Sequence, residues 1–131
     1  MFYNAQSFNQ PIGKCDVKNV TDIAYMFDGA KTFNQPLGNW DVSKVTKMRK
    51  MFLMAKTFNQ PIGGWIVSKV DNMDEMFYEA DAFNQPIRDW DVSKLVNMND
   101  MFILSSSKMT NMQAMFYKCP IQYNNIPSFK L

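Results

Sequence analysis

Histidine is absent from this sequence of 131 residues. The commonest general base and the commonest metal ligand are therefore both missing. The sequence also lacks a G-x-S-x-G motif, a P-loop and a G-x-G-x-x-G motif. No pair of carboxylates is marked by an apolar setting of the kind that glycoside hydrolysis requires. These absences predict a protein that is not an enzyme and has no catalytic residues, metal or cofactor.

Cysteine is scarce, with Cys15 and Cys119 at opposite ends of the chain and no C-x-x-C pair. This spacing excludes the common zinc and thioredoxin-like patterns. A disulfide needs Cα atoms within about 7 Å of each other, and two residues at opposite ends of an elongated repeat array cannot satisfy this. We therefore expect two free and mostly buried thiols.

Long apolar runs are also missing, and no stretch reaches the roughly 18 residues that a membrane-spanning helix needs. The start of the chain has no basic segment followed by an apolar one, so no secretory signal is predicted. The formal net charge is only +2. A charge this small predicts neither a nucleic-acid partner nor a membrane partner.

Two residue types are abundant, with 12 methionines and 11 phenylalanines. Their positions are periodic. The tetrapeptide Phe-Asn-Gln-Pro recurs at a constant interval, and the pair Met-Phe recurs at the same interval. Such a fixed period indicates stacked structural units, in which each apolar column packs on its own copy in the next unit. The starting residues of the tetrapeptide are Phe8, Phe33, Phe58 and Phe83.

The period predicts a single solenoid domain over residues 1–131, with four repeats over 1–100. After Met101 the next Met-Phe pair comes early, at Met115, so part of a repeat is missing. We interpret 101–131 as a degenerate repeat and a C-terminal cap, because terminal repeats are usually atypical. The chain opens on a Met-Phe pair, so the apolar columns of the first coil would be exposed. That exposure would invite end-to-end self-association.

Within one repeat, two segments suggest regular structure. Apolar residues from about Thr46 to Ala55 are spaced by three and four, which predicts a short helix. The segment from Pro61 to Trp65 contains proline and glycine and predicts a short extended run. The expected fold is an α/β repeat solenoid. It is a right-handed, leucine-rich-repeat-like coil of about five turns, with short parallel strands on one side and short helices on the other.

Three columns are expected to form structural ladders along the stack. Aligned rings can stack, and side-chain amides in an otherwise apolar stretch can satisfy the backbone and one another. The alternative, in which the amide column binds a ligand, stays open. The ladder residues are Phe33, Phe58, Phe83, Asn34, Asn59, Asn84, Trp40, Trp65 and Trp90.

These repeats are similar to a known family. The segment from Met26-Phe27 to Met48 resembles the repeat of BspA-like leucine-rich-repeat surface proteins and, more narrowly, the repeat of mycoplasma-type surface lipoproteins, which has the same period. The resemblance covers residues 1–100 well and 101–118 partly. It implies a leucine-rich-repeat-like solenoid, a cell-surface setting and a role in adhesion or partner contact. It supplies no catalytic residues.

The outward columns carry complementary charges. A shift of one repeat pairs Arg49 with Asp74, Lys50 with Glu75 and Lys56 with Asp81. These pairs, together with Lys47, would fix the register of neighbouring coils, or they would form a partner-binding surface. A further column, Asp16, Asp41 and Asp91, could bind calcium in principle, but Ile66 interrupts it. Turn formation is the favoured interpretation of those aspartates.

The function expected from the sequence is a protein-interaction or adhesion module on a cell surface or in a secreted protein. Its partner would be a protein or a cell-surface ligand. The alternative is an intracellular scaffold in the cytoplasm. Adjacent basic and acidic columns argue against a nucleic-acid groove, which needs charge of one sign.

Overall fold

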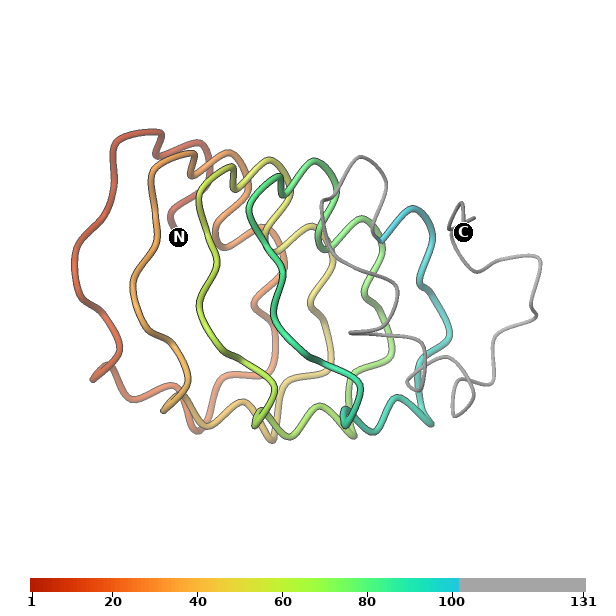
Figure 1. The fold of residues 1–131 in the computed structure, drawn as a ribbon. Helices are drawn as coiled ribbons and strands as arrows, with labels where there is room; N and C mark the ends of the chain where they lie inside the picture. Colours follow the sequence, from red (N-terminus) through yellow and green to blue (C-terminus); the bar gives the residue numbers. More distant parts are fainter. Residues whose placement is uncertain (102–131) are drawn as a thin grey trace.

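The computed structural model describes residues 1–101 and shows a stack of coils, one for each repeat (Figure 1). Isolated parallel bridges connect each coil to the next at equivalent positions, Asp22 with Lys47, Lys47 with Asn72 and Asn72 with Asn97. The period of the sequence is therefore the period of the structure. The degenerate repeat and cap expected over 101–131 lie outside the described residues, apart from Met101.

The predicted α/β solenoid with strands and helices is wrong. Residues 1–101 contain no helix, and their only strand-like features are the isolated bridges. The segment 46–55 consists mainly of turns. The segment from Pro61 to Trp65 also forms a turn, in which the Trp65 N–H donates to the Ile62 carbonyl at 3.1 Å. The coils are therefore built from turns and short irregular segments.

Successive β-turns explain why an apolar spacing of three does not mean a helix here. In each coil, N–H groups donate to the carbonyl three residues earlier, as from Met51 to Met48 at 3.2 Å and from Val70 to Val67 at 3.0 Å. In the second to fourth repeats, most of these turns begin and end on apolar residues of the core. A spacing of three therefore fits a chain of turns as well as it fits one face of a helix.

The N–H groups of the segment predicted as a helix follow an alternating pattern. Ile23, Tyr25, Phe27 and Gly29 donate to carbonyls of the next coil, whereas Met26, Asp28 and Ala30 close turns within the local chain. A helix would direct all of these groups to the carbonyl four residues earlier. The backbone is also left-handed at every Tyr25-equivalent position, which interrupts a right-handed helix. Those positions are Tyr25, Lys50, Glu75 and Asp100, with φ of 63°, 55°, 54° and 53°.

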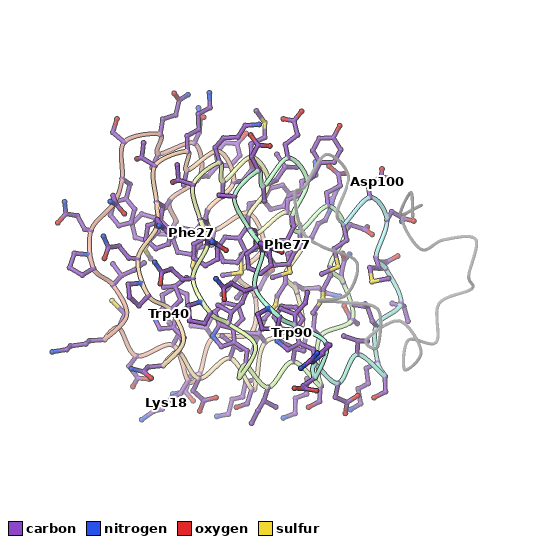
Figure 2. The ribbon with its side chains drawn as sticks, in the orientation of Figure 1. Lys18, Phe27, Trp40, Phe77, Trp90 and Asp100 are labelled. Carbon is purple, nitrogen blue, oxygen red and sulfur yellow. The ribbon has the colours of Figure 1, made fainter. Side chains whose placement is uncertain are left out.

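The core is a set of apolar columns that run the length of the stack (Figure 2). Phe27, Phe52 and Phe77 stack at centroid distances of 5.5 and 5.7 Å. A second column, Phe33, Phe58 and Phe83, stacks at 6.0 and 6.1 Å. Rings of the two columns also stack within each coil, as Phe52 does on Phe58 at 4.2 Å. Each coil thus buries its apolar face largely against its neighbours.

The first coil is less buried than the others. Phe2, Phe8, Ile12, Val17 and Val20 pack against the core but are only partly buried. Cys15 is a free thiol and is exposed, so the prediction that it is buried is wrong. Cys15 occupies the tryptophan column in the first coil of the structure, at the open end of the stack (Figure 1). Cys119 lies outside the described residues.

Candidate interaction surface

An amide ladder runs along one side of the stack. The Oδ1 atoms of Asn9, Asn34 and Asn59 each accept a 2.9 Å hydrogen bond from the backbone N–H of the equivalent asparagine in the next coil. The glutamine that follows that asparagine donates its Nε2 to the same Oδ1, at 3.1 to 3.2 Å. The ladder replaces backbone pairing at this side of the coil. The amides therefore act mainly on the protein itself.

The tryptophans form a comparable ladder on the inside. The indole N–H groups of Trp40, Trp65 and Trp90 donate to backbone carbonyls of the preceding coil at 3.0 to 3.1 Å. The rings of Trp65 and Trp90 stack at 6.4 Å with an interplanar angle of 4°. With 5% or less of each residue exposed, these rings cannot serve as an outer platform for a ligand. Their role is therefore structural, since they hold neighbouring coils together.

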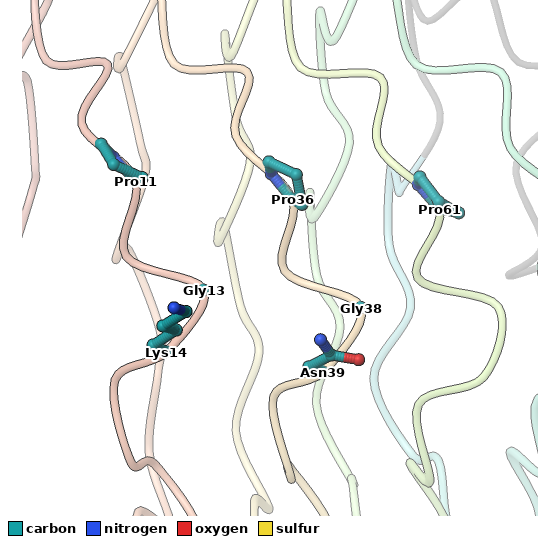
Figure 3. A pocket seen from close by; sticks show the side chains of 7 residues that line it. All are labelled: Pro11, Gly13, Lys14, Pro36, Gly38, Asn39 and Pro61. Carbon is teal, nitrogen blue, oxygen red and sulfur yellow. The ribbon is translucent and has the colours of Figure 1, made fainter.

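A groove of about 500 Å³ crosses the first three coils (Figure 3). It follows the turns that connect the amide ladder to the tryptophan column. Proline rings and glycine backbone form most of its lining, and the turn position after each glycine differs between coils, with Lys14 in the first and Asn39 in the second. The full lining is Pro11, Gly13, Lys14, Pro36, Gly38, Asn39 and Pro61. The groove is not among the sites predicted from the sequence, although the recurring Pro-x-Gly pattern marks it.

The charged columns face each other across neighbouring coils. Lys50 pairs with Glu75 at 3.7 Å, and Lys56 lies 3.3 Å from Asp81 and 3.5 Å from Glu79. Lys47 pairs with Asp71 at 2.5 Å. Arg49 lies over the Tyr25 ring, 5.6 Å from its centroid. Two of the three pairs that were expected between residues one repeat apart therefore form, Lys50 with Glu75 and Lys56 with Asp81.

The expected pair between Arg49 and Asp74 does not form among the described residues. Asp74 instead accepts a 2.8 Å hydrogen bond from the Asn99 backbone N–H. This carboxylate therefore caps a turn of the next coil. Most of the charges on this surface are used within the protein, which favours register fixing over partner binding.

The pKa values of two surface groups reflect these contacts. Burial lowers the pKa of Lys56, but hydrogen bonds and attraction to Asp81 and Glu79 outweigh that effect, so its pKa is raised. The pKa of Asp41 is lowered, chiefly by hydrogen bonds from the Ser43 hydroxyl and backbone N–H. The same contact from the residue two positions on occurs at Asp16 and Asp91. The aspartate column thus forms turns.

The pKa of the Asp28 carboxylate is raised, because burial outweighs the attraction of Lys50 and Glu75 adds repulsion. The ionised Asp28 carboxylate therefore destabilises the folded protein when the pH is above the folded-state pKa. This destabilisation disappears when the pH is below the unfolded-state pKa of about 3.9. We expect Asp28→Asn to raise the melting temperature at pH 7 and to lose that advantage as the pH falls towards 3.

Asp41→Asn provides a control of opposite sign for Asp28→Asn, measured by thermal unfolding across the same pH range. The lowered pKa of Asp41 stabilises the fold above its unfolded-state pKa, and this contribution is lost on acidification. Asp41→Asn is therefore expected to lower the melting temperature at pH 7 and to converge with the unmodified chain in acid. Parallel pH profiles for the two variants would contradict the assignment.

The stacked coils, buried ring columns and amide ladder define a repeat solenoid protein. The chain belongs to the family described as "Mycoplasma protein of unknown function, DUF285", which matches residues 1–115. No curated protein and no solved structure matches the chain significantly.

Two features are absent from the described part of the chain. Within residues 1–101, no helix is long and apolar enough to cross a bilayer. The same residues hold no group of three or more cysteine, aspartate or glutamate side chains that could bind a metal ion.

Proposed function

We propose that the chain is a non-enzymatic interaction or adhesion module of a repeat-containing surface protein, comparable in use to the BspA-like surface proteins that its repeat resembles. The observation that supports this most is the contrast between the columns that hold the coils together, which repeat, and the residues exposed in the groove, which vary. The asparagine and phenylalanine columns make equivalent contacts between successive coils, whereas the groove position that follows glycine is Lys14 in the first coil and Asn39 in the second. The equivalent residues of the next two coils are Gly64 and Asp89. Variation on a constant frame suits recognition.

Adhesion can be tested with beads that carry the folded chain. We expect such beads to bind host cells more than beads carrying heat-unfolded chain, and a groove variant, Lys14→Glu with Asn39→Glu, to bring binding close to background. Lys31→Glu is the control, because Lys31 is exposed but does not line the groove. Equal binding by folded and unfolded chain would refute adhesion, and equal effects of the groove variant and the control would refute the groove.

Surface display is a separate part of the proposal, and the alternative is an intracellular scaffold. Brief protease treatment of intact cells distinguishes the two. Loss of the repeats from intact cells, with an internal protein preserved, would support display. Repeats that are degraded only after lysis would favour the scaffold.

A further inference from the structure

Lysines occupy the same turn position in three successive coils, at Lys44, Lys69 and Lys94, and form a row. Each is the third residue of a β-turn that a backbone hydrogen bond of 2.9 to 3.0 Å closes, as from Val70 to Val67. All three side chains are exposed. Because equivalent positions of paired chains lie about 5 Å apart, the row places three like charges in line.

The row contrasts with the charged columns that lie further along each coil. There, Lys47, Lys50 and Lys56 each pair with an acid of the next coil. Here, the Lys44 ammonium donates to the Asn19 Oδ1 at 2.9 Å, and neither Lys69 nor Lys94 forms an ion pair with any residue of the described range. Repeated like charge is unfavourable within the protein, and an external anion would relieve it.

Acidic neighbours are limited along this row. Asp41 and Asp91 precede Lys44 and Lys94 in their turns, and their carboxylates accept backbone N–H bonds from Ser43 and Ser93. At the equivalent place before Lys69 stands Ile66, which is 61% exposed. The middle of the row therefore lacks the carboxylate that the other coils provide.

We propose that this lysine row binds a linear anionic polysaccharide, with sulfate or carboxylate groups placed along the row. A single line of charges matches a linear polymer better than a flat membrane, whose capture needs larger clusters of about 4–8 basic residues. Binding of single-stranded nucleic acid would need aromatic platforms for the bases. The large apolar side chains exposed in the described part are Met1, Tyr3, Ile66 and Val96, of which only Tyr3 is aromatic.

This inference goes beyond the groove of the proposed function, because it assigns a second surface and a partner class for it. It is tested on the purified chain with immobilised heparin and polygalacturonate as probes. We expect salt-sensitive binding to at least one of the two, which also distinguishes sulfate from carboxylate. Replacing Lys44, Lys69 and Lys94 with glutamine should weaken binding about tenfold or more. Replacing Lys31, Arg49 and Arg88 with glutamine removes the same charge from exposed positions outside the row and the groove, and should change binding less than about twofold.

Ile66→Asp provides a second test that preserves the fold, because aspartate is the residue that the other three coils carry there. We expect it to weaken polysaccharide binding about threefold or more, while Ile66→Ser leaves binding unchanged. Three results would overturn the inference: no binding by the folded chain, equal losses in the two triple variants, or stronger binding to oligothymidylate or to phosphatidylserine vesicles. Because no cells are used, these results are independent of the protease test for surface display.

Discussion

Replacing Trp65 with alanine is expected to lower the free energy of unfolding by about 3–5 kcal/mol. The indole is 4% exposed, stacks on Trp90 and donates to the Leu37 carbonyl at 3.0 Å. Its removal leaves a cavity at the junction of three coils. Chemical denaturation, followed by a backbone signal such as far-ultraviolet circular dichroism, measures the loss.

Trp65→Phe separates ring packing from the hydrogen bond. This variant keeps an aromatic ring and loses the indole N–H, so the expected cost is only about 1 kcal/mol. If the alanine and phenylalanine variants were equally stable, the ring would not fill the space between the coils, and the packing described for this column would be incorrect.

The largest effect of a single methyl group is expected at Gly63. A Cβ atom at this position would lie 2.5 Å from the backbone carbonyl oxygen of Pro86 in the next coil. That oxygen belongs to the frame and cannot move aside as a flexible side chain would. We therefore expect Gly63→Ala to cost about 1–3 kcal/mol of stability, measured by the same denaturation experiment.

The adjacent Gly64 provides a matched control. A Cβ atom there would meet nothing within 4 Å. Gly64→Ala should leave stability unchanged or raise it slightly, because alanine restricts the unfolded chain more than glycine does. Equal destabilisation by the two variants would show that the close approach between coils is not the cause.

The same contact explains an exception in the sequence. Gly13 and Gly38 face the proline carbonyl of the next coil as Gly63 does, with Cβ distances of 2.7 and 3.2 Å. The fourth coil has Arg88 at this position, and the residue where the next proline would fall is Asn111. Glycine is thus present where a Phe-Asn-Gln-Pro segment follows in the next coil, and it is replaced where none follows.

The period of the repeat could be predicted from the sequence, because identical residues recur at fixed distances whatever the local backbone does. The local backbone could not be predicted in the same way. An apolar spacing of three between Val45, Met48 and Met51 is shared by a helix face and by consecutive β-turns. The deciding features are the left-handed residues such as Lys50 and the N–H groups directed to the next coil. Side-chain identity specifies neither of these, since lysine is an unusual residue for positive φ.

The surface was also only partly predictable. Complementary charges one repeat apart indicated the pairs that Lys50 and Lys56 make, because stacking places equivalent positions side by side. The predicted pair of Arg49 with Asp74 is wrong, since the Tyr25 ring in the preceding coil competes for the guanidinium group of Arg49. The groove could not be predicted from the sequence, because its position depends on where the turns lie.

The asparagine ladder has a consequence for how such proteins change over time. The Oδ1 atoms of Asn9, Asn34 and Asn59 each bind the coil that follows, so each of these three joints is complete whatever the total number of coils. An in-frame duplication or deletion of one whole repeat unit would create a joint identical to those already present. Gene recombination can therefore lengthen or shorten the stack and its exposed surface, while the contacts between neighbouring coils stay the same.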